Sequence, residues 1–352
     1  MPEVIFAVPG DLKTPTGGYI YDRRVIELLP GLGWHARHIE LPSDYPEPSP
    51  ASLQKTERIL ADLPRDVILV IDGLAFGAMP AELVGRIANP IVPLVHHPLA
   101  LETGIATERA EYLWHTERAA LAHAVHVIVT SPATAELLVR DFDLGVEQVT
   151  TAEPGTEAAE RAHGSDGPAR LLSVGSVTER KGYDTLIAAL ALIADLPWES
   201  RIAGSIERDR AALQTVRKAI KGAQLERRVT LTGSLDDRVL AQEYDRATLF
   251  VLPSHFEGYG MAFAEALARG LPVVACAGSA VSTTVPADAG LLVPRGDATA
   301  LAQALRTLLT DRNELARRAD AAWRHAERLP RWHDTARKFA QGLERARQEI
   351  EA

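Results

Sequence analysis

Two carboxylates, Glu257 and Glu265, flank a short glycine-containing stretch, and this spacing suits a ligand with several hydroxyl groups. Carboxylates accept hydrogen bonds from hydroxyls. The glycines between them permit positive φ angles and bring backbone amides close to a ligand, and the start of the following helix presents the positive end of its dipole to a phosphate. The amides predicted to face the ligand are those of Gly258, Tyr259, Gly260 and Met261. Together these residue types predict a nucleotide-sugar site.

The elements predicted around this stretch would place both carboxylates at one edge of a sheet. Residues 248–252 are an apolar run typical of a strand buried on both faces. Residues 261–269 favour a helix ended by a glycine, and residues 273–276 favour the next strand. Glu257 would then lie in the loop before the helix, and Glu265 about one turn inside it.

Two cations follow another predicted strand. This strand ends at Gly175, Arg180 and Lys181 lie in the loop, and a helix begins after Gly182. Basic side chains at the carboxyl end of a strand, opposite a helix N-terminus, suit a diphosphate group. We therefore predict that Lys181 and Arg180 bind phosphate.

Residues 257–274 (EGYGMAFAEALARGLPVV) resemble the Glu-x7-Glu signature of retaining glycosyltransferases of the GT-B fold, glycosyltransferase family 4. The resemblance implies an α/β fold of two Rossmann-like domains that face each other across a cleft. It also implies that Glu265 holds the ribose hydroxyls of the nucleotide and that Glu257 faces hydroxyls of the donor sugar. The donor would be a nucleoside diphosphate sugar, with UDP favoured over GDP as the nucleotide.

The cation-bearing stretch resembles the same family, with one departure. Lys181-Gly182 matches the family's Lys-Gly, whose lysine grips the donor's diphosphate, but Ser176 stands where the family has an arginine. We expect Arg180 to take over that charge. A second departure is the absence of a carboxylate from residues 278–284, where relatives often read Gly-Gly-x-x-Glu.

The N-terminal half is expected to contribute a histidine. The strand predicted at residues 91–95 ends in His96 and His97. Members of the family carry a histidine there that contacts the donor sugar near the reacting carbon; His96 aligns best and His97 is the alternative. Amides of the family's first-strand loop approach the donor phosphate or the acceptor, and the matching residues here are Gly17 and Gly18. Further candidates at the ends of strands are Ser131, Gly175, Ser176 and Ser254.

The expected chemistry needs neither a metal nor another cofactor. Cleaving a sugar–diphosphate bond builds negative charge on the leaving group, and fixed cations and amides can stabilise that charge. No convincing Asp-x-Asp metal site is present, and Asp236-Asp237 is more simply a helix N-cap. The resemblance implies retention of the anomeric configuration by front-face attack, in which the departing phosphate accepts the acceptor's proton. That route requires no protein nucleophile.

Strands alternate with helices of about ten residues along the chain, which predicts parallel, doubly wound sheets. A polar tract at residues 156–168 is expected to link an N-terminal domain on the acceptor side (residues 1–155) to a C-terminal domain on the donor side (residues 169–331). In the resembling family a C-terminal helix packs back on the N-terminal domain, and residues 332–352 fit that role.

Composition narrows the classes of function. A net charge of −9 argues against a nucleic-acid partner, and no Gly-x-Gly-x-x-Gly follows the first strand, which disfavours a dehydrogenase. The single cysteine, Cys276, and the lack of a basic leader or long apolar run favour a cytoplasmic protein, with peripheral membrane contact left open. The alternatives are a GT-B sugar-nucleotide epimerase or hydrolase and an inert nucleotide-sugar-binding subunit. No motif tells a small-molecule acceptor from a lipid-linked saccharide or a polysaccharide.

Overall fold

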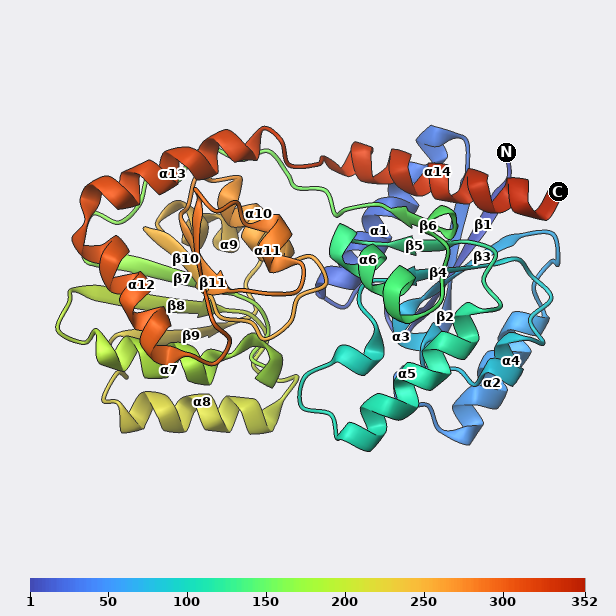
Figure 1. Ribbon diagram of the computed structural model, residues 1–352, viewed down its shortest axis with the longest axis horizontal. Coiled ribbons are helices and arrows are strands. Elements are labelled where there is room, and N and C mark those ends of the chain that lie inside the picture. Colours follow the sequence, from blue (N-terminus) through green and yellow to red (C-terminus); the bar gives the residue numbers. More distant parts are fainter. Residues whose placement is uncertain (352) are drawn as a thin grey trace. The chain divides into compact units, whose positions relative to one another are not determined.

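The structure, a computed structural model, describes residues 1–351 and divides into two compact units. Unit 1 comprises Met1–Gly155 and the segment that begins at Pro330, and unit 2 comprises Thr156–Leu329. Each unit is built on a six-stranded sheet of its own (Figure 1). The chain thus leaves unit 1 once and returns to it in its last segment.

The sheet of unit 1 is parallel throughout, with the order β2-β1-β3-β4-β5-β6. Its central strands are continuous apolar runs, as expected of a parallel sheet whose faces are both covered, and every residue of β3 and β4 is buried. The strands are β1 (Glu3–Pro9), β2 (His35–Leu41), β3 (Ile68–Asp72), β4 (Ile91–Val95), β5 (Val127–Val129) and β6 (Val149–Thr151).

The first helix of unit 1 corrects one expectation. Helix α1 (Gly17–Leu28) begins at Gly17 because the Thr16 side chain accepts a hydrogen bond from the amide of Tyr19 (3.2 Å). Gly17 and Gly18 therefore lie in its first turn and not in the preceding loop. The other helices of unit 1 before the return segment are η1 (Leu29–Leu32), α2 (Pro50–Ala61), α3 (Gly73–Phe76), α4 (Ala81–Val84), η2 (Leu99–Leu101), α5 (Thr107–Leu121), α6 (Pro132–Asp141) and η3 (Val146–Gln148).

Helix α14 (Trp332–Glu351) packs on unit 1 beside α1, β5 and β6 (Figure 1). The Phe339 ring stacks on Phe6 of β1, with 5.5 Å between the ring centroids. Gly342 permits a close approach, since an added Cβ would lie 2.9 Å from Ile128 Cδ1. The buried face of the helix repeats at helical spacing and includes Trp332, Ala336, Phe339 and Leu343. The return helix thus completes the core of unit 1.

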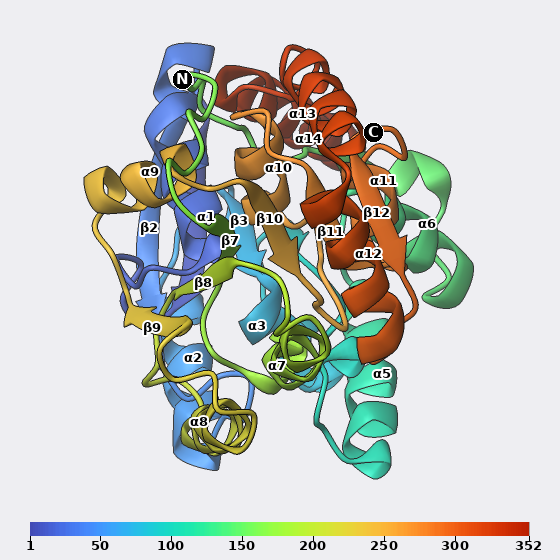
Figure 2. The ribbon, with the colours of Figure 1, turned by 90° about the vertical axis from the view of Figure 1, so that its left-hand side faces the viewer.

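The sheet of unit 2 is also parallel, with the order β12-β11-β10-β7-β8-β9, and faces the viewer in Figure 2. Its strands are β7 (Ala169–Val174), β8 (Trp198–Ala203), β9 (Val229–Gly233), β10 (Leu249–Leu252), β11 (Val273–Cys276) and β12 (Gly290–Val293). Its helices are η4 (Glu179–Lys181), α7 (Tyr183–Leu192), α8 (Arg210–Gly222), α9 (Asp237–Asp245), α10 (Met261–Leu267), α11 (Val281–Thr284), α12 (Ala298–Thr310) and α13 (Arg312–Ala326). Across residues 1–351, no helix combines the length and the apolar character needed to span a membrane.

Two short strands and one tract differ from the sequence expectations. The pattern does not predict β6, whose three residues VTT are mostly polar, or β12, whose short run GLLV begins with a glycine. Residues 156–168, expected to be a linker, pack on unit 2. The amide of Ala162 donates to the Arg269 carbonyl (3.0 Å), and the amide of Gly164 donates to the Asp245 carbonyl (2.9 Å). This polar tract is therefore hydrogen-bonded to the surface of unit 2 and is not a free linker.

Gly155 and Trp332 lie against each other where the chain leaves unit 1 and where it returns. A Cβ added to Gly155 would lie 2.3 Å from the backbone nitrogen of Trp332, which can move only if α14 moves. We expect Gly155→Ala to lower the free energy of unfolding by about 1–3 kcal/mol in a urea titration, the range for overpacking. The control is Gly31→Ala, whose Cβ would meet no atom within 4 Å. Equal stability of the two variants would contradict this packing.

Candidate functional site

Each sheet reverses its strand order at one point, and the charged residues of interest gather there. In unit 2 the order runs from β7 to β9 in one direction and from β10 to β12 in the other, so the reversal lies between β7 and β10. In unit 1 it lies between β1 and β3. Open parallel α/β sheets bind ligands outside the carboxyl ends of their strands at such points. Each unit therefore has one preferred place for a ligand.

In unit 2 the loop after β7 is held against the loop after β10. The amide of His255 donates to the carbonyl of Arg180 (2.8 Å). Gly182, with a φ of 63°, follows η4 at a position where a Cβ would lie 2.3 Å from the carbonyl oxygen of Pro253. Glycine alone tolerates both the backbone angle and the contact. Lys181 and Arg180 are thereby fixed beside the residues that follow β10.

Lys181 and Arg180 both bind one buried carboxylate, that of Glu257. Lys181 Nζ lies 2.6 Å from Oε1, and Arg180 Nη1 lies 3.2 Å from Oε2. Arg180 also donates to the carbonyl of Phe256 (2.7 Å). Burial raises the pKa of Glu257, but the two cations more than offset this effect and lower it to about 2. Glu257 is thus ionised at neutral pH, and the three side chains together retain one excess positive charge.

The loop after β11 supports the Glu257 backbone. Ser279 Oγ accepts a hydrogen bond from the Glu257 amide (3.1 Å), and the Ala280 amide donates to the Glu257 carbonyl (3.2 Å). Thr284 Oγ1 donates to the carbonyl of Tyr259 (2.7 Å). This is the loop whose sequence lacks a carboxylate. Its hydroxyl groups instead brace the segment that carries Glu257.

Glu265 lies one turn inside α10, which ends at Leu267 and so two residues earlier than predicted. Its Oε2 accepts a hydrogen bond from the Tyr244 hydroxyl of α9 (2.8 Å). Burial raises the pKa of Glu265 and outweighs the opposite effects of Tyr244 and Arg269. The carboxylate is therefore oriented by a neighbouring helix and does not point freely into solvent.

The remaining candidates of unit 2 lie around these groups. The carbonyl of Gly175 accepts from the Tyr183 hydroxyl (2.9 Å), and a Cβ on Gly175 would lie 3.0 Å from Lys181 Cε. Gly260, with a φ of 91°, is the N-cap of α10. The loops after β7 and β10 or the start of α10 also contain Ser176, Ser254, Gly258, Tyr259 and Met261, of which Ser254 and Tyr259 are buried.

In unit 1, His96 at the end of β4 faces two carboxylates. Its Nε2 lies 3.4 Å from Asp22 Oδ1 on α1 and 3.6 Å from Asp72 Oδ2 at the end of β3. Asp22 is 0% and Asp72 is 2% exposed. Gly18 packs on the same ring, since a Cβ there would lie 3.3 Å from Nε2. Burial lowers the pKa of His96, but the nearby carboxylates of Asp22 and Asp72 outweigh this effect and raise the pKa to about 10.

The other N-terminal candidates make different contacts. His97 Nε2 lies 3.1 Å from Glu102 Oε2. Ser131 is the N-cap of α6, where its hydroxyl accepts from the Thr134 amide (3.1 Å). Gly17 is exposed at the start of α1. Among these predicted residues, Gly18 and His96 lie in contact.

Comparisons of the sequence with known proteins match unit 2 to glycosyltransferases. Residues 168–311 match the family model described as "Glycosyl transferases group 1". The MMP alpha-(1->4)-mannosyltransferase of Mycolicibacterium hassiacum is 25% identical over 327 residues, which cover 86% of this chain and 76% of that protein. The chain is a homologue of glycosyltransferases. Three other curated relatives match over 37%, 55% and 57% of their length, so the chain spans about half the length of those proteins.

Solved glycosyltransferase structures resemble the chain over nearly its full length. The sucrose-phosphate synthase tll1590 of Thermosynechococcus elongatus has a TM-score of 0.80 and 25% identity, and the match covers 96% of this chain and 97% of that one. HepE of Anabaena, solved with UDP and glucose, has a TM-score of 0.77 and 17% identity, with coverage of 97% and 99%. These matches confirm the predicted GT-B fold class for this glycosyltransferase homologue.

Several residues of the two clusters were not anticipated from the sequence. Asp72 carried a weak signal, because it is a polar residue that ends an apolar strand. Asp22 lies inside a helix and gave none. Tyr244 and Ser279 reach Glu265 and Glu257 from neighbouring segments. Their contributions depend on which elements become neighbours, and no local pattern reports this.

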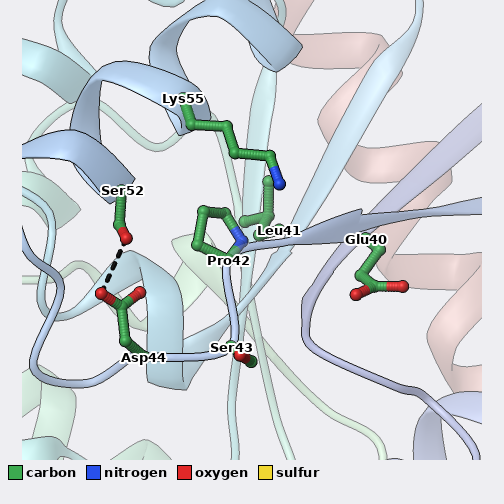
Figure 3. A pocket seen from close by; sticks show the side chains of 7 residues that line it. All are labelled: Glu40, Leu41, Pro42, Ser43, Asp44, Ser52 and Lys55. Carbon is green, nitrogen blue, oxygen red and sulfur yellow. Dashed lines mark hydrogen bonds between the residues drawn. The ribbon is translucent and has the colours of Figure 1, made fainter.

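A hollow of about 510 Å³ opens at the carboxyl end of β2 (Figure 3). His96 follows β4 at the same carboxyl edge of the sheet. Asp44 accepts a hydrogen bond from Ser52 Oγ (2.7 Å) at one side of it. The side chains that line it are Glu40, Leu41, Pro42, Ser43, Asp44, Ser52 and Lys55. One cation among two carboxylates does not specify a ligand, and none of the predicted site residues lines this hollow.

Replacing Lys181 should destabilise the fold, because the buried carboxylate of Glu257 then loses one of its two cations. We expect Lys181→Met to raise the Glu257 pKa from about 2 and to lower the free energy of unfolding at pH 7 by about 2 kcal/mol. This is less than the about 3–5 kcal/mol typical of a buried pair that loses one partner, because Arg180 remains. Urea unfolding measures the change.

The double variant Lys181→Met/Glu257→Gln provides the control. It removes the unpaired charge, so it should recover part of the lost stability. The wild-type pH dependence has a fixed sign: Glu257 stabilises the fold above its ordinary pKa of 4.5, and this contribution is lost as the pH falls toward 2. A double variant as unstable as the sum of the two single variants would contradict the ion-pair explanation.

Proposed function

We propose that the chain is a retaining, metal-independent glycosyltransferase that takes its sugar from a nucleoside diphosphate donor. The observation that carries this proposal is a pair of cations, Lys181 and Arg180, that both form ion pairs with buried Glu257. They lie beside the strand-order reversal of unit 2. A diphosphate is the group that two adjacent fixed cations suit best. Homology to glycosyltransferases supports the same conclusion.

The nucleotide would lie along the loops after β7 and β10. Glu265, held by Tyr244, would accept hydrogen bonds from the ribose hydroxyls, and the amides of Gly258 to Met261 would face phosphate oxygens. We favour UDP as the nucleotide; one structural neighbour, HepE, was solved with UDP and glucose. Arg180 would supply the second positive charge that Ser176 cannot supply.

In the reaction, Lys181 and Arg180 would stabilise the charge that develops on the leaving diphosphate. The acceptor hydroxyl would attack from the side that the diphosphate leaves, and the departing phosphate oxygen would take its proton, so the anomeric configuration is retained. Glu257 would keep both cations in place before the donor arrives and meet the donor sugar's hydroxyls afterwards. No protein nucleophile takes part.

The proposal assigns no metal to the donor site, because fixed cations supply the positive charge. The adjacent Asp236 and Asp237 have a structural explanation: Asp236 caps α9 by accepting from the Val239 amide (2.8 Å). The acceptor would be a hydroxyl group of a small molecule, a lipid-linked saccharide or a polysaccharide end.

A ligand panel tests the donor proposal first. UDP, GDP, ADP and their common sugar conjugates are each added to the full chain at millimolar concentration, with magnesium or with EDTA. We expect UDP or a UDP sugar to raise the melting temperature equally in both conditions. Release of free sugar or an epimerised nucleotide in the same mixtures would indicate a hydrolase or an epimerase. The absence of any shift would overturn the donor site, and a shift that requires magnesium would overturn metal independence.

The phosphate role of Lys181 is tested by turnover. We expect Lys181→Ala to reduce kcat by about 10²–10³, the scale for losing one group that stabilises developing charge. The matched control is Lys218→Ala, which removes an exposed lysine of α8 in the same unit. Initial rates of sugar transfer at saturating donor give the comparison. A near-normal rate for Lys181→Ala would refute the assignment.

A further inference from the structure

His96, Asp22 and Asp72 form a cluster in unit 1 that contains two carboxylates and one imidazole. Both oxygens of Asp22, Oδ2 of Asp72 and Nε2 of His96 are buried and form no hydrogen bond of ordinary length. The other oxygen of Asp72 is occupied, since Oδ1 accepts from the Leu74 amide (2.9 Å). Two carboxylates that are 0% and 2% exposed thus face one imidazole nitrogen. A buried carboxylate is costly unless a positive charge or a proton accompanies it.

The groups around the ring leave His96 as the cation nearest to both carboxylates. Tyr21 of α1 packs against the ring at an angle of 88°, with 5.4 Å between centroids, and burial keeps its hydroxyl protonated by raising its pKa. Burial raises the pKa of Asp22 to about 6, and His96 and, to a lesser extent, Arg23 oppose this rise. Thr130 donates to the His96 carbonyl (3.3 Å) and does not reach the ring.

The protonation state of the His96 ring decides whether Nδ1 donates a hydrogen bond to a ligand or accepts one from it. Nε2 is buried against the carboxylates, so Nδ1 is the ring nitrogen that a ligand can reach. In a neutral imidazole whose proton is on Nε2, Nδ1 is an acceptor; in the imidazolium it is a charged donor. The same side chain would thus bind a hydroxyl hydrogen in one state and an electron-rich oxygen in the other.

We propose that Asp22 and Asp72 are positioning residues that keep His96 doubly protonated and present its Nδ1–H as a charged hydrogen-bond donor to an oxygen of the bound sugar or phosphate. This inference rests on the proposed function for the identity of that oxygen. The protonation state itself rests on the geometry of the cluster alone. The direction of the His96 pKa, raised by Asp22 and Asp72 to about 10 despite burial, supports it.

The pH dependence follows with a fixed sign. The His96 pKa is raised above its ordinary 6.5, so its contribution to stability is fully present below that value and is lost as the pH rises through about 10. Removing one carboxylate removes part of the cause. His96 should then titrate closer to neutral pH in Asp22→Asn and in Asp72→Asn.

The direct test is a ¹⁵N NMR titration of the full chain with labelled histidine, from pH 5 to pH 10.5, with His96 assigned by the loss of its signals in His96→Gln. We expect both ring nitrogens of wild-type His96 to remain protonated up to about pH 9, and each Asn variant to lower its pKa by about one unit or more. The control is Asp66→Asn, which lies before the start of β3 and not at its carboxyl end; it should leave the titration unchanged.

Three results would overturn the proposal. Wild-type His96 could titrate near its ordinary pKa, the Asn variants could leave that pKa unchanged, or EDTA could shift the His96 signals. The last result would show a cation held by the same three side chains, whose ligand atoms lie within 4.8 Å of one another. The wild-type titration needs no variant, so a variant that fails to fold does not remove the test.

A second readout connects the charge to turnover. We expect kcat/KM of the wild type to stay level from pH 6 to pH 9, whereas that of Asp72→Asn should fall by about tenfold per pH unit above its new His96 pKa. A level profile for Asp72→Asn would overturn the donor role of Nδ1. If the NMR results are as expected but no sugar transfer is detected with any donor, the proposed function fails while the charge of His96 stands.

Discussion

A buried carboxylate needs a positive charge or a proton beside it, and this requirement organises the charged interior of the chain. Glu257 is matched by Lys181 and Arg180 and stays ionised. Asp22 and Asp72 share His96. Glu117 of α5 is equally buried without a cation; it accepts one bond from the Leu99 amide (3.0 Å), and burial raises its pKa to about 8, so it carries a proton at neutral pH. The two charged clusters lie beside strand-order reversals, whereas Glu117 holds the first residue of η2.

In both sheets, a reversal of the strand order determines where the charged side chains lie. Where the strand order reverses, the segments that follow neighbouring strands run to opposite sides, and an opening remains at the carboxyl edge. In unit 2 the segments after β7 and β10 supply the cations and the carboxylate. In unit 1 the end of β3, the end of β4 and the helix after β1 supply Asp72, His96 and Asp22. The position of both clusters thus depends on topology as much as on any single motif.

Local patterns were sufficient for most of the fold and for the charged residues Glu257, Lys181 and Arg180 of unit 2, but in unit 1 they found His96 without Asp22 and Asp72. Apolar runs predicted the long buried strands. The glycine-bounded motifs located Glu257, Glu265 and Lys181, because these residues lie in the loop or the short helix that comes next after a strand. The pattern placed Gly17 and Gly18 in a loop, since it did not weigh the Thr16 cap. Asp22 reaches His96 only after α1 packs beside the sheet, and sequence spacing does not encode that neighbour.

The return of the chain to unit 1 has a consequence for its synthesis. Unit 2 lies between Gly155 and Pro330, so it is an insertion within unit 1. The ribosome therefore completes unit 2 before it makes α14, whose Phe339 covers Phe6 on the first strand. The surface of the first sheet that α14 covers therefore lacks this partner until α14 itself has been made. Because domains generally fold as units, the second sheet has the chance to form first, while the first waits for its last helix.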